Sequence, residues 1–275
     1  QWLEFPGLDE EIKKELLQIS GCEEEIAARF SRELKFGTGG IRGCMGAGSS
    51  RLNIYIVRKV TEGLARFIQK TTSEISIANE PPRVVIAYDT RKNSDRFARE
   101  TASVLLNWKI KAYLFSKPVP TPLLSFAVRE LKAVAGVVIT ASHNPAEDNG
   151  YKVYWSDGGQ ITDGLAQAIT AEIAAVEDEL LVETGDLEDA AHLGMLVTIG
   201  EEMISKYLEH LSRLHMDINH KEYYPHLKVV YTPLYGTGME IVPRALQAAG
   251  LENLFLVSSQ AKPDPSFGTI KHPNP

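Results

Sequence analysis

Three side chains that could act together in catalysis stand next to one another in this sequence. They are the hydroxyl of Ser142, the imidazole of His143 and the amide of Asn144, within the hexapeptide Thr-Ala-Ser-His-Asn-Pro at 140–145. A free serine hydroxyl is a poor nucleophile, so it needs a base or concentrated positive charge nearby. His143, the downstream Lys152 and local backbone N–H groups could supply that charge. The pattern therefore predicts a site where Ser142 carries or accepts a phosphoryl group.

The same hexapeptide also fits an ordinary surface loop. Ser, Asn and Pro are common in turns, where the side chains of Ser142 and Asn144 would only accept hydrogen bonds from turn amides. The lysine at 152 and a second candidate segment at 36–43 favour the phosphoryl hypothesis.

The second segment, Phe-Gly-Thr-Gly-Gly-Ile-Arg-Gly at 36–43, has four glycines in eight residues around Arg42. Glycine lets backbone N–H groups approach an anion closely, and an arginine can hold phosphate through two parallel hydrogen bonds. Taken alone, the segment also fits a flexible turn. It lacks the Gly-Lys-Ser/Thr of a nucleotide P-loop, so an ATP site is not expected. The candidate phosphate ligands here are Thr38, Gly39, Gly40 and Arg42.

The hexapeptide followed by Asn-Gly-x-Lys resembles the phosphoserine loop of the α-D-phosphohexomutase superfamily of phosphoglucomutases and phosphomannomutases. The wider match, from the glycine-rich segment to Trp155, resembles its phosphoglucomutase-2/phosphopentomutase branch. The resemblance covers nearly the whole chain. It implies an isomerase that interconverts sugar 1-phosphates with sugar 6- or 5-phosphates. The phosphoryl group of Ser142 would pass to a sugar monophosphate, giving a sugar 1,6-bisphosphate that returns its other phosphate to Ser142.

The resemblance also implies roles for the neighbouring residues. Arg42 would stabilise phosphoryl charge, and Lys152 would assist proton transfer at the sugar hydroxyl. His143 and Asn144 would shape the loop. A magnesium ion would be held in part by a phosphoryl oxygen on Ser142.

Part of that machinery is not expected in this chain. Magnesium prefers six oxygen ligands, and the family supplies the others from a loop of alternating aspartates, whereas no Asp-x-Asp-x-Asp occurs here. The family's sugar-binding and distal phosphate-binding loops lie in later domains. We therefore expect the remaining metal ligands beyond Pro275, and little activity from these 275 residues alone. The choice among glucose, mannose and pentose phosphates stays open.

Asp89 and Arg91 follow an apolar run at 83–88 that predicts a buried strand. Open α/β sheets place their sites at the carboxyl ends of strands, so both residues are candidate phosphate-site residues. A local ion pair that fixes the loop is an equal alternative.

Alternating strands and helices are expected to position these residues, in a layered α/β/α domain with a mixed sheet and right-handed crossovers. Asn149-Gly150 predicts a turn before an edge strand that contains Lys152. The expected elements are two short helices in 9–34 with Asp9 and Ser20 as possible caps, a helix from Asn53, strand 83–88, a helix capped by Ser94, strand 111–116, a proline-stiffened crossover at 118–122, helix 123–130, strands 135–140 and 151–155, a long helix from Thr162 to about 181 and a solvated acidic loop at 183–189.

A second repeat of the pattern begins after Ile199-Gly200. It predicts a helix from Met203, strand 227–232, helix 239–249 and strand 254–257, then an irregular proline-rich end. We therefore expect one domain at 1–199 and an incomplete second domain of similar type at 200–275.

Composition excludes some function classes. A net charge of −7 argues against a nucleic-acid or membrane-surface protein, because both need a basic face. Cys22 and Cys44 lack metal-ligand spacing and indicate reduced thiols in a cytoplasmic protein. Residues 1–20 are too charged for a signal peptide. The rival hypotheses are a sugar-phosphate-binding or regulatory module without turnover, and a serine hydrolase, although Gly-x-Ser-x-Gly is absent. The oligomeric state is not readable from the sequence.

Overall fold

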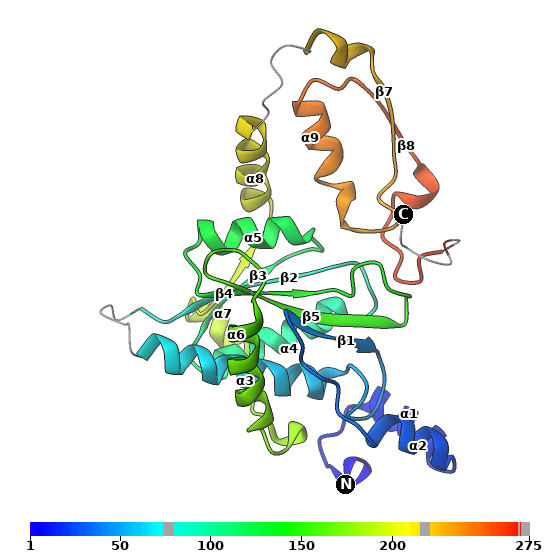
Figure 1. The fold of residues 1–275 in the computed structure, drawn as a ribbon, viewed down its shortest axis with the longest axis vertical. Coiled ribbons are helices and arrows are strands. Elements are labelled where there is room, and N and C mark those ends of the chain that lie inside the picture. The colour runs from blue at the N-terminus through cyan, green and yellow to red at the C-terminus, as the bar shows by residue number, and fades with distance from the viewer. Residues whose placement is uncertain (74–79, 215–220, 269, 271–275) are drawn as a thin grey trace.

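The computed structural model describes residues 1–73, 80–214, 221–268 and 270 of the chain. Its main body is a six-stranded mixed sheet with helices on both faces (Figure 1). A smaller unit of helices and two strands extends beyond one helical layer. The expected layered α/β/α fold with a mixed sheet is confirmed.

The sheet combines parallel and antiparallel pairs. β2 lies between β3 and β4 and is parallel to both, and β6 is parallel to β3. β5 is antiparallel to β4, and β1 is antiparallel to β5. In spatial order the strands are β1 (Gly40–Cys44), β5 (Asp148–Trp155), β4 (Ala135–Ile139), β2 (Arg83–Tyr88), β3 (Lys111–Phe115) and β6 (Leu196–Ile199).

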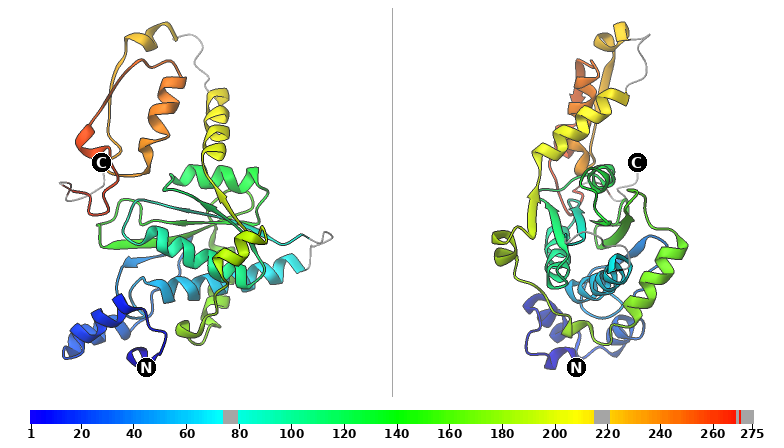
Figure 2. Two further views of the ribbon diagram at one scale, coloured as in Figure 1. Left: turned by 180° about the vertical axis from the view of Figure 1, so that it is seen from behind. Right: turned by 90° about the vertical axis from the view of Figure 1, so that its left-hand side faces the viewer.

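Helices cover both faces of the sheet, which explains its apolar central strands (Figure 2). Every residue of β4 is buried, as expected for a central strand packed on both faces. The helices on one face are α3 (Ile54–Ser73), α4 (Ser94–Asn107) and α6 (Asp163–Ala174), and the other face carries α5 (Thr121–Glu130) and the start of α8 (Glu201–Leu214).

The expected turn at Asn149-Gly150 and the edge position of the following strand are both wrong. Both residues lie inside β5, and β1 pairs with the outer side of that strand. Asn149 is fully buried, and its side-chain amide donates to the carbonyl of Lys92 and the hydroxyl of Ser94. The sequence did not predict β1 because a glycine-rich strand lacks alternating hydrophobicity.

Between β5 and β6 the elements differ from the prediction. The long helix expected to reach 181 ends at Ala174, and a short 3₁₀ helix, Glu179–Leu181, follows separately. The expected solvated loop at 183–189 overlaps the start of α7 (Leu187–His192), where the Asp186 carboxylate accepts hydrogen bonds from the N–H groups of Glu188 and Asp189. β6 then follows as a strand that the sequence had not indicated.

Three expected helix starts differ in detail. Asp9 caps α1 (Glu10–Ile19) as predicted, but Ser20 ends α1 instead of starting α2 (Glu23–Phe30). Ser94 is the first residue of α4, and its hydroxyl donates to Asp89 Oδ1 instead of capping the helix. α5 begins at Thr121 with a proline in its first turn, so the stiff crossover is shorter than expected.

The C-terminal unit, residues 201–270, contains the expected helix, strand, helix and strand. They are α8, β7 (Lys228–Tyr231), α9 (Val242–Ala248) and β8 (Asn253–Leu256), with β7 parallel to β8. This unit also has short 3₁₀ helices at Lys221–His226, Thr237–Met239 and Ser258–Gln260. A further short 3₁₀ helix, Trp2–Glu4, lies at the start of the chain.

β6 ends at Ile199 and α8 begins at Glu201, and the domain boundary at 199/200 stays a prediction. Much of the expected irregular end, 269 and 271–275, lies outside the described residues. Within the described part of the chain, no helix is both long and apolar enough to cross a membrane.

Candidate active site

Ser142 stands in a tight loop at the carboxyl end of β4. Its backbone has a φ of 59°, a region that non-glycine residues rarely adopt. Its N–H donates to the Thr140 hydroxyl at 2.9 Å, and the N–H of Asn144 donates to the Ala141 carbonyl at 3.2 Å. These short-range bonds hold the strained residue, whose side chain is exposed to solvent. Sequence reasoning missed Thr140, although a hydroxyl two residues before a turn amide is a recognisable turn signal.

The imidazole of His143 lies beside the Ser142 hydroxyl. Ser142 Oγ lies 3.4 Å from His143 Nδ1, and both side chains are exposed. This distance is at the long end for a hydrogen bond, so the imidazole is close enough to exchange a proton after a small rotation. Asn144 points elsewhere, since its amide donates to Asp148 Oδ2 at 2.7 Å within the loop.

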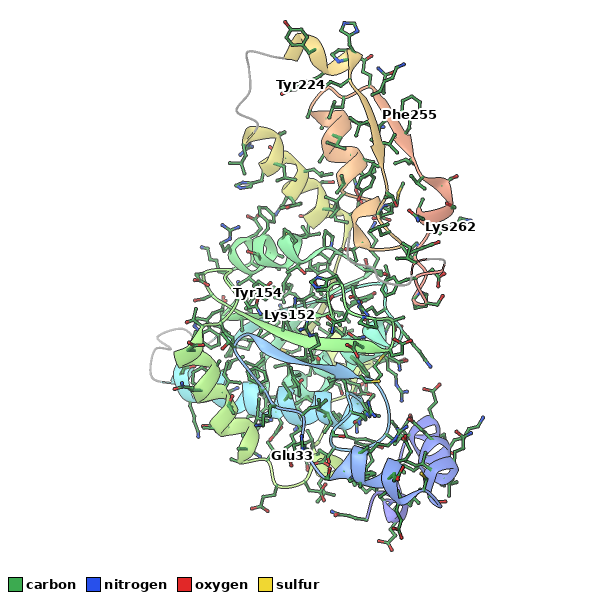
Figure 3. All side chains as sticks on the ribbon, turned by 45° about the vertical axis from the view of Figure 1, so that its right-hand side comes forward. Glu33, Lys152, Tyr154, Tyr224, Phe255 and Lys262 are labelled. Atoms are coloured by element: carbon green, nitrogen blue, oxygen red, sulfur yellow. The ribbon has the colours of Figure 1, made fainter. Side chains whose placement is uncertain are left out.

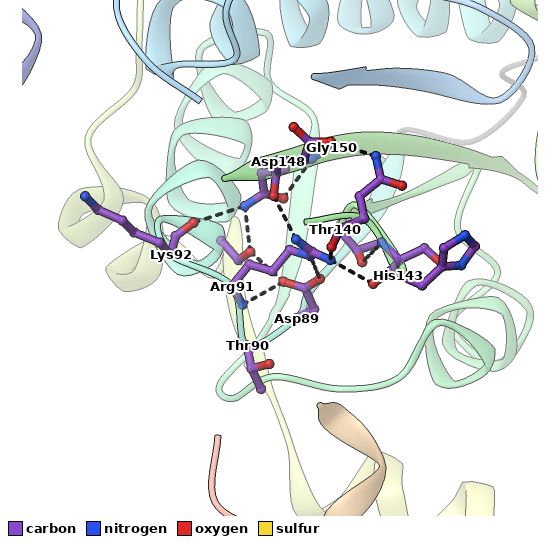
Figure 4. Close-up of polar contacts among 12 residues, drawn as sticks. Asp89, Thr90, Arg91, Lys92, Thr140, His143, Asp148 and Gly150 are labelled. Atoms are coloured by element: carbon purple, nitrogen blue, oxygen red, sulfur yellow. Dashed lines mark hydrogen bonds and ion pairs between the residues drawn. The ribbon is translucent and has the colours of Figure 1, made fainter. Parts of the chain in front are cut away.

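Arg91 binds the Ser142 loop through its backbone carbonyls (Figure 4). Nη1 donates to the carbonyls of Pro145 at 2.7 Å and Asp148 at 2.9 Å. Nη2 donates to the carbonyls of Ser142 at 2.9 Å and Asn144 at 2.7 Å. We call this arrangement the carbonyl clamp. Arg91 is only 4% exposed, so the loop is anchored to a buried cation.

The carbonyl clamp fits the alternative in which Arg91 and Asp89 fix the loop, and their contact with phosphate stays a prediction. All four N–H bonds of the Arg91 terminal nitrogens point at carbonyls, which leaves none of them for a phosphate. Asp89 Oδ1 accepts from the backbone N–H of Arg91 and from the Ser94 hydroxyl. Asp89 Oδ2 lies 3.4 Å from the guanidinium Nε of Arg91. The alternative of a local ion pair that fixes the loop describes this geometry. Burial lowers the pKa of Arg91, and Asp89 partly opposes that shift.

Arg42 and Lys152 lie on one face of two neighbouring strands beside the loop. Arg42 is opposite Gly150 in the β1–β5 pair, and Lys152 is opposite Gly40. Residues two apart share a face of a sheet, so the two cationic side chains are diagonal neighbours. The Thr140 N–H donates to the Gly150 carbonyl, which joins this pair of strands to the start of the Ser142 loop.

Neither cation is neutralised within the described residues: no hydrogen bond or ion pair there involves the side chain of Arg42 or Lys152. Arg42 is exposed, and Lys152 is half-buried on β5 (Figure 3). Burial lowers the pKa of Lys152, the charge of Arg42 lowers it further, and Asp89 opposes the shift. Two unpaired cations this close disfavour each other, and a bound anion would relieve that cost.

The glycine-rich segment brings β1 against β5. A Cβ on Gly40, whose φ is 145°, would lie 2.1 Å from the Tyr151 carbonyl oxygen. The Gly39 carbonyl accepts from the Val153 N–H, and the Gly40 N–H donates across the turn to Gly37. The Thr38 hydroxyl donates to Asp163 Oδ1 at 2.7 Å. These groups therefore hold strands and helix together, and their predicted contact with phosphate stays a prediction.

The described residues do not supply a magnesium site. No group of three or more His, Cys, Asp or Glu side chains among them is arranged to hold a metal ion. Asp148 accepts a hydrogen bond from Asn144 and Asp89 accepts one from Ser94, so both of these carboxylates already have partners. A phosphoryl oxygen on Ser142 would provide one ligand at most.

Family comparison supports the likeness seen in the motifs. The model of phosphoglucomutase/phosphomannomutase alpha/beta/alpha domain I matches residues 33–180, and that of domain II matches 205–275.

Individual relatives agree with the family models. The chain is 36% identical over 274 residues to a phosphoglucomutase of Staphylococcus aureus, covering 100% of this chain and 47% of that protein. It is 36% identical over 295 residues to the phosphopentomutase of Mus musculus, covering 100% and 44%. A solved structure from Thermus thermophilus, provisionally described as a phosphomannomutase, matches with a TM-score of 0.71 at 28% identity, covering 87% of this chain and 48% of that one. The chain thus spans about half the length of the relatives it matches.

Proposed function

Because the chain belongs to the phosphoglucomutase/phosphomannomutase family of the α-D-phosphohexomutase superfamily, we propose that the protein is a phosphosugar mutase that works through a phosphorylated Ser142. It interconverts a sugar 1-phosphate with the corresponding 6- or 5-phosphate. Relatives named for glucose and for pentose phosphates match equally well, so the choice of sugar stays open.

One observation carries this proposal. Ser142 is exposed in a loop that a buried arginine holds by its carbonyls, beside two cations that lack partners among the described residues. Phosphoryl transfer depends mainly on positioning and on stabilising the charge of the moving group. The carbonyl clamp supports the first requirement, and Arg42 with Lys152 supports the second.

In the proposed half-reaction, a hydroxyl oxygen of the sugar monophosphate attacks the phosphorus of phosphorylated Ser142. The bond from phosphorus to Ser142 Oγ breaks, which gives a sugar bisphosphate and a serine alkoxide. The proton of the attacking hydroxyl ends on Ser142 Oγ, and Lys152 and His143 would assist its transfer. Burial and the charge of Arg42 lower the pKa of Lys152, which makes its proton easier to release to a reacting group.

In the second half-reaction, the other phosphoryl group of the bisphosphate is transferred back to Ser142. Ser142 Oγ then attacks that phosphorus, and the sugar leaves with the phosphate that it first received. Arg42 would stabilise the equatorial phosphoryl oxygens in both steps. A sugar 1,6-bisphosphate would therefore serve as activator and intermediate. A magnesium requirement remains an expectation from the family resemblance, and no step above depends on it.

Mass spectrometry of the whole gene product tests the proposal. We expect a phosphate adduct mapped to Ser142, and loss of mutase turnover in Ser142→Ala. Ser212→Ala, an exposed serine on α8, is the control and should keep full activity. Turnover that survives Ser142→Ala would refute the phosphoserine route. Sugar-phosphate binding without turnover in the wild type would favour a non-catalytic binding protein.

We also propose a cytoplasmic setting. Both cysteines, Cys22 and Cys44, are free thiols, which is typical of a reducing compartment.

A further inference from the structure

Phe267 of the C-terminal unit covers the open face of Arg91. The Arg91 Cζ atom lies 4.8 Å from the centroid of the Phe267 ring. Phe267 is 5% exposed and Arg91 4%, so both partners are shielded from water. The segment around Phe267 reaches from the C-terminal unit to the six-stranded body (Figure 1).

Phe267 is held in place by its own segment. Its N–H donates to the Asp264 carbonyl at 3.0 Å, and its φ is 56°. The Asp264 carboxylate accepts from both the N–H and the hydroxyl of Ser266. Next to the ring, a Cβ on Gly268 would lie 2.6 Å from the Tyr235 hydroxyl, so this turn packs tightly on Tyr235.

A second contact from the C-terminal unit lands on the residue next to Arg91. The Thr90 hydroxyl donates to the Tyr235 carbonyl at 3.0 Å. Tyr235 is itself 7% exposed. Phe267 and Tyr235 of the C-terminal unit therefore both contact the turn between β2 and α4 that contains Arg91.

The hydrogen bonds of Arg91 explain why an aromatic ring beside it is stabilising. Its Nε is buried and makes no hydrogen bond, although Asp89 lies nearby. Since the terminal nitrogens of Arg91 already donate to four carbonyls, the faces of the guanidinium are open to further stabilisation. An aromatic face supplies that stabilisation through its quadrupole, and it keeps water from competing for the carbonyls.

We propose that Phe267 is a positioning residue for Ser142. By packing on Arg91 it stabilises the carbonyl clamp, and so ties the conformation of the Ser142 loop to the placement of the C-terminal unit. The proposal deepens the proposed function and rests on it for its catalytic consequence, but the link between Phe267 and the loop is separate from any activity.

Phe267→Leu in the whole gene product is the main test. Leucine keeps an apolar side chain without a ring face and, unlike valine or isoleucine, is not branched at Cβ, which matters at this positive φ. We expect amide hydrogens of residues 142–148 to exchange about tenfold faster. We also expect kcat to fall about tenfold with an unchanged KM.

Two further variants interpret the result. Phe267→Tyr keeps the ring face and should restore slow exchange and most of kcat. Phe115→Leu removes a comparably buried ring from β3, 1% exposed, and should leave exchange in the loop unchanged.

Slow loop exchange in Phe267→Leu, equal to the wild type, would overturn the proposal. Equal acceleration in Phe115→Leu would also overturn it, because the effect would then be general destabilisation. If the wild type shows no mutase turnover, the proposed function fails while the exchange experiment still decides the role of Phe267.

Discussion

Arg91 and Arg42 are both near the Ser142 loop, and the structure uses them in opposite ways. Arg91 is 4% exposed, and its terminal nitrogens donate to four carbonyls of the loop. Arg42 is exposed, and its side chain has no hydrogen bond or ion pair with any residue that the structure describes. The sequence alone offered both as phosphate ligands.

The difference between Arg91 and Arg42 shows how an arginine that supports the fold can be distinguished from one that is open to a ligand. A buried guanidinium needs hydrogen-bond partners within the protein, so its terminal N–H groups are already engaged. An exposed guanidinium without partners keeps its donors for a ligand. Changes at Arg91 should therefore act first on folding, and changes at Arg42 first on activity.

Arg91→Ala should show the largest effect. It leaves four partly buried carbonyls and Asp89 without their partner, and we expect a loss of about 3–5 kcal/mol in unfolding free energy. Urea denaturation followed by circular dichroism measures this loss. Arg91→Lys keeps the charge but has three donors in place of the planar fork, so its loss should be intermediate. A loss under about 1 kcal/mol in Arg91→Ala would contradict the structural role.

Arg42→Gln should give the opposite profile. We expect kcat/KM to fall by about 10²–10³ because charge on the moving phosphoryl group is less well stabilised. Unfolding free energy should change by less than about 0.5 kcal/mol. Arg32→Gln, an exposed arginine before the glycine-rich segment, is the matched control and should change neither quantity. Near-normal turnover in Arg42→Gln would remove Arg42 from the site.

Gly150→Ala tests the close packing that places Arg42. The added Cβ would lie 2.6 Å from the Thr140 carbonyl oxygen and 3.0 Å from that of Ile41, so β1 or β4 must move away from β5. We expect a loss of about 1–3 kcal/mol, read from urea denaturation. Gly164→Ala in the first turn of α6 is the control, because its Cβ would meet nothing within 4 Å. Equal stability of the two variants would argue against tight packing at Gly150.

Lys152 should report the charge of Arg42 through its pKa. Burial and Arg42 lower that pKa from 10.5, so between the lowered value and 10.5 the unfolded chain binds more protons than the folded one. Stability attributable to this lysine therefore rises as the pH rises through that interval. In Arg42→Gln we expect the Lys152 pKa to move upward, measured by NMR of labelled lysine with Lys152→Met for assignment. An unchanged pKa would place Arg42 too far away to matter.

Thr38→Val should have the smallest effect. It removes the exposed hydrogen bond to Asp163, so we expect a loss under about 1 kcal/mol and nearly normal KM for the sugar phosphate. A KM raised more than tenfold would instead support the phosphate contact predicted from the sequence. Steady-state kinetics with urea denaturation separates the two outcomes.

Local patterns were enough to predict much of the molecule. Apolar runs and helical spacing predicted β2, β3, β4, α3 and the order of elements in the C-terminal unit. The hexapeptide around Ser142, together with Lys152 and the glycine-rich segment, was sufficient to propose a phosphoryl-transfer loop. These features depend on residues within one strand, helix or turn, where side-chain period and turn chemistry act directly on the backbone.

Only the tertiary structure decided how the site is held together. β1 could not be identified because its glycines are explained by contact with β5, more than a hundred residues later in the chain. The carbonyl clamp was equally hidden, since backbone carbonyls carry no mark in the sequence. The sequence by itself determined which residues could do chemistry. The fold decided which cation supports the loop and which remains open to a ligand, because burial and hydrogen-bond partners arise only when distant segments pack.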